Sequence, residues 1–314
     1  MNIVLLEGLG VSKEIIDKHA AKLAEMGHTF AAYDKNTDAG VQLERSRDAD
    51  VVMIANMPLA KRVVEESANL KYIDVAFTGV DHIPVAEAKA RGIAVSNASG
   101  YATQAVAELC ICFMIELLRK VPQAEAKCRA SGTKDGLNFR LLAGKTVGIV
   151  GCGAIGKRTA ALCRAFGAHV IGFNRSKVTD PVIEEQVSLE ELLKRADIVS
   201  LHTPLTPETR GMISTKQLAL MQPSAYLINT ARGGVVDQDA LAAALLKGQI
   251  AGAALDVFYE EPPLPANHPL LGIPNTIVTP HMAFSSVESM EERCTIVFDN
   301  LYSWLAGTQL NKIC

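Results

Sequence analysis

Along most of the chain, short runs of apolar residues alternate with longer segments whose apolar residues recur every three or four positions. The short runs are rich in valine and isoleucine, which favour buried strands, whereas the longer segments have the periodicity of amphipathic helices. Strands separated by helices predict parallel sheets with right-handed crossover connections. The hydrophobic pattern therefore predicts an α/β fold.

The first part of the chain, residues 1–98, has the pattern of a small α/β domain. The strands expected there are 3–6, 51–54, 72–75 and 94–96. The helices expected there are 12–26, which begins at a capping serine, 59–67 and 84–91. Because this part contains no G-x-G-x-x-G sequence, we predict that it is a second, smaller domain with a flavodoxin-like sheet.

From about residue 147 the same alternation predicts six strands, the number in a doubly wound dinucleotide-binding sheet. The strands are expected at 147–150, 169–173, 198–201, 225–229, 253–257 and 276–278. The helices are expected at 157–166, 188–195, 215–221 and 238–247. The sequence thus predicts two Rossmann-like domains, a doubly wound parallel-sheet cofactor domain and the smaller substrate domain.

Two long helical segments are expected to connect these domains. A helix over 103–130 follows a turn at Ser99 and Gly100, and we expect it to cross from the first domain to the second. The segment 287–305 is long and apolar, so we expect it to return to the first domain. The predicted substrate domain is therefore 1–98 plus 287–314, and the predicted cofactor domain is 99–286.

The strand at 147–150 runs into a glycine-rich turn, G-C-G-A-I-G, that leads to the next helix. In such a turn Gly151 allows the tight bend, Gly153 lets the backbone approach a pyrophosphate, and Gly156 lets helix and strand pack closely. The amino terminus of the helix offers N–H groups and a partial positive charge to phosphates. Because the G-x-G-x-x-G lies within a β-α-β unit, it indicates a dinucleotide-binding site.

Composition narrows the classes of partner. The 314 residues are 49% hydrophobic and 21% charged, which is typical of a globular protein without disordered regions. With a net charge of −3, neither nucleic acid nor a membrane is expected as a partner. The start lacks the features of a signal peptide and the seven cysteines form no C-x-x-C pair, so a reducing, cytoplasmic location is expected.

Ligands of doubly wound sheets bind beyond the carboxyl ends of the strands, so the residues just past each predicted strand are candidates for chemistry. They are His202, Thr203, Pro204, Thr230, Ala231, Arg232, Asp256, Glu260, Glu261, Thr279, Pro280 and His281. An arginine suits a planar carboxylate, and a histidine can donate a proton to a carbonyl near neutral pH. A carboxylate beside that histidine would favour its charged form. The predicted chemistry is hydride transfer between a nicotinamide and a carbonyl.

Two other histidines are rivals of His281 as proton donor. His202 precedes a polar turn, T-P-L-T-P-E-T, which is better suited to flank the cofactor, and His268 lies in a proline-rich loop where a surface role is expected. No spacing of His, Cys and Asp indicates a metal site, and no G-x-S-x-G sequence indicates a nucleophile.

Several motifs in order resemble the D-2-hydroxyacid dehydrogenase family, in particular its glyoxylate and hydroxypyruvate reductases. They are V-S-N-A-S-G-Y-A-T-Q-A-V-A-E, G-C-G-A-I-G, H-T-P-L-T-P-E-T-R-G-M-I, L-I-N-T-A-R-G-G-V-V-D, A-L-D-V-F-Y-E-E-P-P and T-P-H. The resemblance implies that Arg232 binds the substrate carboxylate, that His281 is the acid/base and that Glu261 pairs with it. It also implies that Asp256 contacts the nicotinamide side.

The fingerprint, the strand ends and the resemblance together give the expected ligand-binding residues. Those expected to bind the cofactor are Thr103, Gly151, Gly153, Ala154, Ile155, Gly156, Asn174, Arg175, Ser176, His202, Thr203, Pro204, Thr209, Thr230, Ala231, Arg232, Asp256 and His281. Those expected to bind the substrate are Asn56, Phe77, Thr78, Gly79, Arg232 and His281. In the loop 77–79 the backbone N–H groups are expected to serve the substrate carboxylate.

The end of the second strand of the fingerprint unit indicates the type of cofactor. An NAD-binding sequence has an acidic residue about twenty positions after the glycines, and here Asn174 takes that place. Arg175, Ser176 and Lys177 can bind a 2′-phosphate, which a carboxylate would repel. NADP(H) is therefore the expected cofactor, with NAD(H) as the alternative.

Two other functions stay open. A non-catalytic, dinucleotide-sensing corepressor resembles these enzymes, and so does an NAD-dependent phosphoglycerate dehydrogenase, which would need more basic residues around its substrate. The presence of Arg232, Glu261 and His281 favours catalysis on a small 2-keto or 2-hydroxy acid. From the resemblance we also expect a homodimer built on the cofactor domain, with the helix that begins at Thr103 as the candidate contact.

Overall fold

The computed structural model describes residues 1–260 and 262–314. It divides into two compact units: unit 1 is Met1–Ala102 with Ser285–Cys314, and unit 2 is Thr103–Phe284. The predicted boundaries, 98/99 and 286/287, lie within four residues of these divisions. Unit 2 is thus inserted into unit 1 along the chain.

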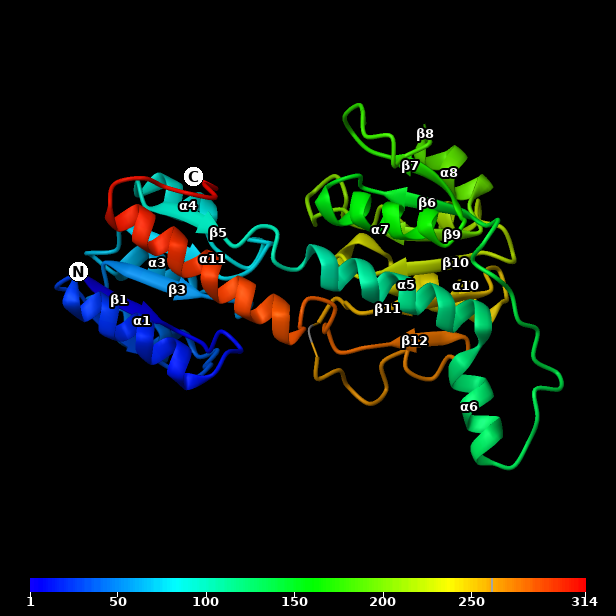
Figure 1. Ribbon diagram of the computed structural model, residues 1–314, viewed down its shortest axis with the longest axis horizontal. Coiled ribbons are helices and arrows are strands. Elements are labelled where there is room, and N and C mark those ends of the chain that lie inside the picture. Colours follow the sequence, from blue (N-terminus) through cyan, green and yellow to red (C-terminus); the bar gives the residue numbers. More distant parts are fainter. Residues whose placement is uncertain (261) are drawn as a thin grey trace. The chain divides into compact units, whose positions relative to one another are not determined.

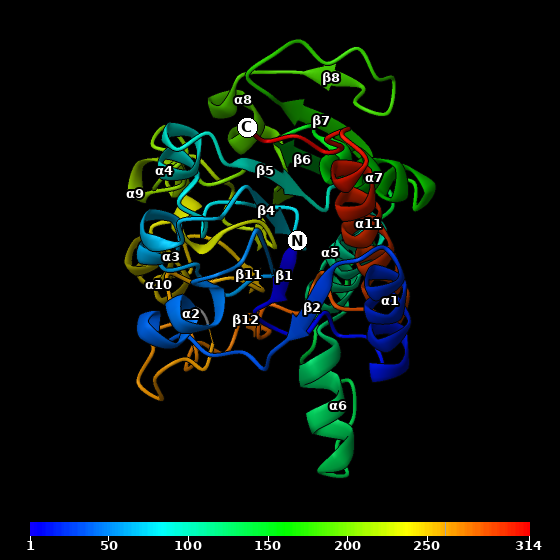
Figure 2. The ribbon, with the colours of Figure 1, turned by 90° about the vertical axis from the view of Figure 1, so that its left-hand side faces the viewer.

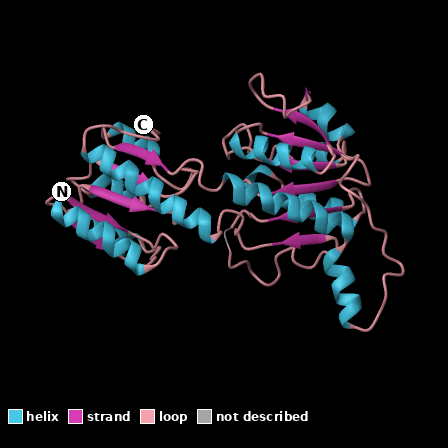
Figure 3. Ribbon diagram, viewed as in Figure 1, coloured by secondary structure: helices cyan, strands magenta, loops and turns pink. Residues whose placement is uncertain are grey.

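Unit 1 is built on a parallel sheet in the strand order β2-β1-β3-β4-β5, which is the flavodoxin-like order (Figure 3). Its strands are β1 (Asn2–Leu5), β2 (Thr29–Ala32), β3 (Val51–Ile54), β4 (Tyr72–Val75) and β5 (Ala94–Asn97). Strands β3 and β4 are buried at all four positions, because helices cover both faces of the sheet. The strand order reverses between β1 and β3.

The helices of unit 1 form a layer on each face of its sheet. They are α1 (Lys13–Glu25), α2 (Ala39–Ser46), α3 (Lys61–Glu66), α4 (Val85–Ala90) and α11 (Val287–Leu305). Figure 2 shows α1 and α11 on one face and α2, α3 and α4 on the other. Helix α11 buries Cys294, Val297, Phe298 and Leu301 against β1 and β3 and belongs to unit 1.

The last residues of the chain cover the β5 edge of the unit 1 sheet. Val95 N–H donates to the carbonyl of Cys314 at 3.1 Å, and Ile313 N–H donates to the carbonyl of Val95 at 2.8 Å. The Ser96 hydroxyl donates to the carbonyl of Leu310 at 2.6 Å. The tail therefore satisfies strand groups that would otherwise form an open edge.

Unit 2 has a larger parallel sheet in the order β12-β11-β10-β9-β6-β7-β8, the doubly wound arrangement that the sequence predicts. Its strands are β6 (Thr146–Val150), β7 (His169–Phe173), β8 (Glu185–Gln186), β9 (Ile198–Leu201), β10 (Tyr226–Asn229), β11 (Gly252–Leu255) and β12 (Thr276–Val278). The order reverses between β6 and β9, which places the expected ligand crevice beyond the carboxyl ends of these two strands.

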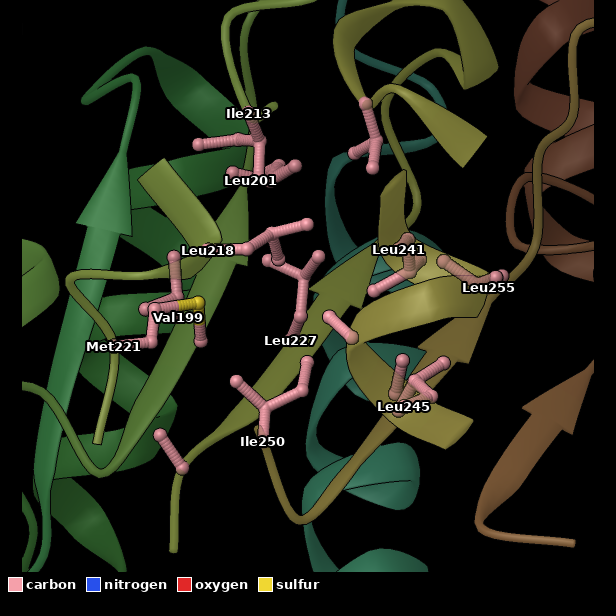
Figure 4. Close-up of a cluster of buried hydrophobic side chains, with 14 of the residues drawn as sticks. Val199, Leu201, Ile213, Leu218, Met221, Leu227, Leu241, Leu245, Ile250 and Leu255 are labelled. Carbon is pink, nitrogen blue, oxygen red and sulfur yellow. The ribbon is translucent and has the colours of Figure 1, made fainter. Parts of the chain in front are cut away.

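Helices cover both faces of the unit 2 sheet. They are α5 (Thr103–Arg119), α6 (Val121–Arg129), α7 (Ala154–Ala165), α8 (Leu189–Arg195), α9 (Thr215–Leu218) and α10 (Gln238–Leu246), with a short 3-10 turn, η1 (Gly233–Val235). Figures 1 and 2 show α5 and α7 on one face and α8, α9 and α10 on the other. A cluster of leucine, isoleucine and valine side chains fills the space under α9 and α10 (Figure 4).

The structure corrects the predicted elements in several places. The helix expected at 103–130 is two helices, because Lys120 has a left-handed φ of 49° and Pro122 lies in the first turn of α6. Both helices lie wholly within unit 2, so neither crosses between domains. Strands β2 and β8 and helix α2 were not predicted, so unit 2 has seven strands among its described residues rather than six.

Candidate active site

The three glycines of the fingerprint have three different surroundings. A Cβ on Gly151, whose φ is +98°, would lie 2.7 Å from the carbonyl oxygen of His202, and one on Gly156 would lie 2.1 Å from that of Gly151. A Cβ on Gly153 would meet no atom within 4 Å. Gly151 and Gly156 are therefore required by the fold itself, whereas Gly153 leaves open space over the turn, which is where a pyrophosphate would approach.

Helix α7 begins directly on this turn, with Gly153 as its N-cap. The helix starts at Ala154 rather than at residue 157 as predicted, because the last residues of the glycine motif form its first turn. The first N–H groups of a helix have no carbonyl partner within the helix, and the first turn of α7 has no acidic residue. The N–H groups around Ala154, Ile155 and Gly156 thus form an anion-binding end.

Asn174, at the end of β7, links this turn to the next loop. Its Oδ1 accepts a hydrogen bond from Cys152 N–H at 3.2 Å, and its Nδ2 donates to the carbonyl and the hydroxyl of Ser176 at 3.1 and 3.0 Å. Gln186 of β8 donates to the carbonyls of Asn174 and Ser176 at 3.2 and 2.9 Å. Arg175 and Lys177 are exposed on this braced loop. An amide and two cations, with no carboxylate, thus stand where the ribose is expected.

The loop after β9 brings His202 and Thr203 beside Gly151. His202 Nε2 is hydrogen-bonded to the Ser200 hydroxyl at 2.9 Å, and burial lowers the pKa of His202 to about 4, so its ring is neutral at pH 7. Within the described chain the hydroxyl oxygen of Thr203 is buried without a hydrogen-bond partner. Thr209 fixes the far side of this loop by donating to the carbonyl of Pro204 at 2.6 Å.

These features fit a bound dinucleotide. The open position over Gly153, the amino terminus of α7 and the orphaned hydroxyl of Thr203 all lie at the carboxyl edge of β6 and β9, where the strand order reverses. An orphaned buried hydroxyl costs free energy unless a ligand completes its hydrogen bonds. Thr103, the other residue expected near the cofactor, is the first residue of α5 and of unit 2.

Arg232 lies on the loop after β10, and Asn229 holds the backbone of that loop. Asn229 is 1% exposed; its Oδ1 accepts from Ala231 N–H at 3.0 Å and its Nδ2 donates to the carbonyl of Arg232 at 2.9 Å. Thr230 is fixed beside it by contact with Cys110 Sγ at 3.2 Å. The orientation of Arg232 is therefore set by a buried side chain of the preceding strand.

Gly233 brings the Arg232 loop against the end of the neighbouring strand. A Cβ on Gly233 would lie 2.0 Å from the carbonyl carbon and oxygen of Phe258, which is an impossible contact for any other residue. The glycine after Arg232 is thus needed for two loops to meet. Arg232 itself is partly buried, and its Nη1 donates to the carbonyl of Ala231 at 2.8 Å.

His281 lies on the loop after β12 in an unusual backbone conformation. Its φ is +55°, a left-handed value that is uncommon for a residue with a side chain. Its ring meets that of Phe284 edge to face, with the centroids 5.5 Å apart. Asp256 is 0% exposed, and its carboxylate accepts the N–H groups of Met282 and Ala283, each at 2.8 Å. The strained turn at His281 is therefore held by a buried carboxylate.

Asp256 has a structural task beside the one implied by the resemblance. Burial raises its pKa, against hydrogen bonds from Thr279, Met282 and Ala283 and the nearby His281, which lower it. Both carboxylate oxygens are engaged by the protein's own donors, so the structure gives Asp256 a role in holding the His281 loop. Its contact with the nicotinamide stays a prediction. Glu261, expected to pair with His281, lies outside the described residues.

The expected substrate residues of unit 1 lie on loops at the carboxyl edge of its sheet. Asn56 follows β3, and Phe77, Thr78 and Gly79 follow β4. Phe77 N–H donates to the carbonyl of Val75 at 2.7 Å, so in this structure that N–H is engaged by the protein itself. The expectation that the backbone of 77–79 serves the substrate carboxylate stays a prediction. The side chain of Phe77 is 6% exposed and packs inside unit 1.

The sequence analysis missed several residues that shape these loops. Ser200 lies inside the predicted strand 198–201, where a hydroxyl gives no sign of its histidine partner. Thr279 was noted only as a strand-end residue, although a hydroxyl directly before the P-H pair is a signal for a hydrogen bond near the histidine. Glu7 was not considered, although a carboxylate directly after an apolar strand is unusual enough to have drawn attention.

Neither a group of metal ligands nor a membrane-spanning helix is found among the described residues. Residues 1–260 and 262–314 contain no group of three His, Cys, Asp or Glu side chains that could hold a metal ion. None of the helices seen in the structure has the length and apolar character needed to cross a membrane.

Comparison with known proteins agrees with the geometry. Residues 111–283 match the model of the D-isomer specific 2-hydroxyacid dehydrogenase, NAD binding domain. The match covers more than half of the chain, so the protein belongs to the D-2-hydroxyacid dehydrogenase family. It is an NAD(P)-dependent oxidoreductase that interconverts 2-keto acids and 2-hydroxy acids.

Three characterised relatives show the range of the resemblance. A glyoxylate reductase of Thermococcus litoralis is 39% identical over 85% of this chain and 84% of its own, and a hydroxypyruvate reductase of Blautia hydrogenotrophica is 32% identical over 100% of this chain and 99% of its own. A D-3-phosphoglycerate dehydrogenase of Methanocaldococcus jannaschii is 40% identical over 84% of this chain. The chain spans only 51% of the length of that dehydrogenase.

Among solved structures, an acyclic imino acid reductase in complex with NADPH and D-Arg has a TM-score of 0.92 and 31% sequence identity to this protein. The two chains match over the whole length of both. The fold of this protein is therefore shared with that reductase.

Proposed function

We propose that this dehydrogenase reduces small, monoanionic 2-keto acids, such as glyoxylate or hydroxypyruvate, with NADPH as the hydride donor. One observation carries the proposal. Arg232 and His281 lie on loops at the carboxyl ends of β10 and β12, the two neighbours of β11, and each loop is held by a buried polar side chain, Asn229 or Asp256. Buried polar groups of this kind fix a reactive geometry that water-exposed loops would not keep.

In the proposed reaction the chain's own residues bind the acid and move one proton. The bound nicotinamide supplies the hydride. The guanidinium of Arg232 binds the carboxylate, because its planar fork matches two oxygens. His281 donates a proton to the carbonyl oxygen as negative charge develops there, and takes it back in the reverse direction. From the resemblance, the backbone N–H groups of the loop 77–79 remain candidates for binding the substrate carboxylate.

His281 is the better proton donor because its rival is neutral. A histidine with a pKa of about 4 is neutral at pH 7, and a neutral imidazole is a very weak acid; the Nε2 of His202 is also hydrogen-bonded to Ser200. His268 is occupied elsewhere: its Nδ1 accepts Leu270 N–H at 3.3 Å, and its ring meets Phe258 edge to face. From the sequence, Glu261 is the partner that would favour the charged form of His281.

The preference for NADPH is supported by the loop after β7. Asn174 presents an amide where NAD-binding sheets present a carboxylate, and the exposed cations Arg175 and Lys177 stand beside it. Arg175 is also close enough to Glu208 to contribute to the lowered pKa of that carboxyl, after the larger effect of the Thr206 hydroxyl. A positive loop of this kind would favour the additional phosphate of NADP(H).

The charges of unit 1 favour a substrate with a single anionic group. The loops that follow β1, β3, β4 and β5, at 6–12, 55–60, 76–84 and 98–102, contain two carboxylates, Glu7 and Asp81, and no lysine or arginine of their own. Lys35 lies in the loop after β2, and Arg293 of α11 is buried and donates to the carbonyl of Leu9. A phosphorylated 2-keto acid would bring a second anion against the two carboxylates. This observation disfavours the phosphoglycerate dehydrogenase alternative.

A panel of 2-keto acids, each assayed for oxidation of NADPH and of NADH, tests the proposal. We expect turnover of glyoxylate and hydroxypyruvate, a higher kcat/KM with NADPH than with NADH, and little turnover of 3-phosphohydroxypyruvate. Inactivity toward the whole panel together with tight NADPH binding would instead support the corepressor-like alternative. A preference for the phosphorylated acid would support the phosphoglycerate dehydrogenase.

We further propose a cytoplasmic homodimer built on unit 2. All seven cysteines are free thiols in the structure, as in a reducing compartment. The apolar face of α5 is largely buried within unit 2, whereas α6 has no buried residue. Light scattering coupled to size exclusion tests the assembly: a mass of one chain at micromolar concentration would contradict the dimer.

A further inference from the structure

Glu7 is a buried carboxylate that none of the chemistry above uses. It lies two residues past β1 and is 4% exposed. Its Oε1 accepts hydrogen bonds from Ala55 N–H at 2.9 Å and from Met57 N–H at 2.7 Å. Ionised side chains are seldom buried so completely unless their hydrogen bonds are needed, so the position of this carboxylate calls for an explanation.

The two strands that Glu7 connects are those at which the order of the unit 1 sheet reverses. Strands β1 and β3 are neighbours, β2 lies beyond β1, and β4 and β5 lie beyond β3. In doubly wound sheets, ligands bind beyond the carboxyl ends of the strands at such a reversal. Glu7 follows β1 and the segment 55–57 follows β3, so the contact lies at the place where unit 1 would bind a ligand.

The geometry of the contact places Asn56 at the tip of a turn. Because one oxygen accepts the N–H groups on both sides of Asn56, the main chain there is fixed while the Asn56 side chain stays partly exposed. Glu7 is too deeply buried to touch a substrate itself. Any effect of Glu7 on binding must therefore pass through the segment that carries Asn56.

His82 fixes the same turn from its other side. Its Nε2 donates to the carbonyl of Ala55 at 2.7 Å, and its carbonyl accepts Leu59 N–H at 3.1 Å. The ring of His82 also meets that of Phe77 edge to face at 5.9 Å, at the start of the loop with Thr78 and Gly79. The peptide groups of Ala55 are thus held by Glu7 on one side and by His82 on the other.

We propose that Glu7 is a positioning residue for substrate recognition, which holds Asn56 in the orientation that binds the distal part of the keto acid. This inference rests on the proposed function, because it takes a 2-keto acid as the ligand of unit 1. The substrate class it implies is a short 2-keto acid, such as hydroxypyruvate, whose end beyond the carbonyl carries a hydroxyl group, which an asparagine amide can bind.

Substitution of Glu7 separates this role from a merely structural one. In Glu7→Ala the turn loses its acceptor, and we expect KM for hydroxypyruvate to rise about ten-fold while kcat and the Kd for NADPH stay within about two-fold. In Glu7→Gln an amide oxygen still accepts both N–H groups, so KM should return to within about three-fold of that of the wild type.

Asp50 provides a matched control at the opposite end of the same two strands. Its carboxylate accepts Asn2 N–H at 2.8 Å and the Lys71 ammonium at 2.7 Å, and so connects β1 and β3 at their amino ends. Asp50→Ala should lower Tm and leave KM for hydroxypyruvate unchanged. A rise of KM in Asp50→Ala equal to that in Glu7→Ala would overturn the inference, as would an unchanged KM in Glu7→Ala.

The same series tells a failure of this inference from a failure of the proposed function. If the wild type turns over no 2-keto acid, the proposed function is wrong, and with it the substrate class named here. If the wild type is active but Glu7→Ala changes KM for the keto acid and the Kd for NADPH by the same factor, the enzyme assignment stands and Glu7 acts on the fold alone.

Discussion

The hydroxyl of Thr279 donates a hydrogen bond of 2.5 Å to the carboxylate of Asp256. Thr279 follows β12 and Asp256 follows β11, so the bond joins the ends of two neighbouring strands just before His281. Together with the N–H groups of Met282 and Ala283, it surrounds one carboxylate with donors from both sides of the histidine. The orientation of His281 is therefore set from the next strand and not by its own flexible loop.

Loss of this carboxylate should impair turnover more than cofactor binding. We expect Asp256→Ala to lower kcat by about a hundred-fold, because the left-handed turn at His281 loses its support and the ring leaves its reactive position. The Kd for NADPH, measured by fluorescence titration, should change much less. Thr279→Val removes a single donor and should lower kcat about ten-fold. A normal kcat in Asp256→Ala would show that the turn at His281 keeps its conformation without the carboxylate of Asp256.

Two glycines of the fingerprint should respond in opposite ways to a methyl group. Gly153→Ala should fold with a Tm close to that of the wild type, because its Cβ meets no atom within 4 Å and its φ of −75° suits alanine. It should nevertheless raise the Kd for NADPH by at least about ten-fold, since the methyl occupies the space over the turn.

Gly156→Ala serves as the contrast. Its Cβ would lie 2.1 Å from the carbonyl oxygen of Gly151, so helix and strand must separate, and we expect a loss of about 1–3 kcal/mol in unfolding free energy. Thermal unfolding and cofactor titration of both variants decide the matter. Unchanged cofactor affinity in Gly153→Ala would place the pyrophosphate elsewhere.

Asn174 should control the choice between the two cofactors. In Asn174→Asp the acceptor for Cys152 N–H is kept, but a negative charge is added beside the expected ribose. The ratio of kcat/KM for NADPH to that for NADH should therefore fall by about a hundred-fold. Asn174→Ala, which removes the amide without adding charge, is the control and should move this ratio far less. An unchanged ratio in the aspartate variant would exclude Asn174 as the selector.

A buried carboxyl of unit 1 should make stability depend on pH. Asp74 of β4 is 0% exposed, its Oδ1 accepts from Asn300 at 3.2 Å, and burial raises its pKa well above the usual range. A carboxyl whose folded pKa is raised stabilises the fold below its unfolded pKa of about 3.9, and that contribution is lost as pH rises.

The isosteric variant Asp74→Asn cannot ionise and should escape this loss. We expect the free energy of unfolding of the wild type to fall, relative to that of Asp74→Asn, as pH rises from 4 toward 8, at up to about 1.4 kcal/mol per pH unit, and its Tm to fall with it. Thermal unfolding at several pH values measures the difference. If Tm changes with pH in the same way in both proteins, Asp74 does not control the pH dependence of stability.

The parts of the fold that could be predicted are those that local pattern decides. Strands 51–54, 72–75, 169–173 and 198–201 have the predicted bounds, because apolar residues fill every or nearly every position of a strand covered on both faces. Strand β2 was missed because T-F-A-A is half exposed at a sheet edge, and β8 because it has two exposed polar residues.

The site also contains residues that could be predicted from the sequence and residues that could not. Arg232 and His281 could be named because ligands bind at strand ends, and the glycine turn because its spacing has one structural use. The supports of the site could not be named. Glu7 and Ala55 are 48 residues apart in sequence, and Asp256 and Met282 are 26 apart, so no periodicity connects them. The hydrogen bond from Phe77 N–H to the carbonyl of Val75 could not be predicted either, because it depends on the local turn of the loop and not on the hydrophobic pattern.

The insertion of unit 2 into unit 1 has a consequence for biosynthesis. As the chain leaves the ribosome, Thr103–Phe284 is complete before α11 exists, whereas the core of unit 1 needs Val297, Phe298 and Leu301 from that helix. Unit 1 is therefore the first unit to begin synthesis and the last to be completed. A nascent chain stalled just after Phe284 should hold a folded, nucleotide-competent unit 2 beside a unit 1 whose sheet still exposes an apolar face, the stage at which a chaperone would be needed.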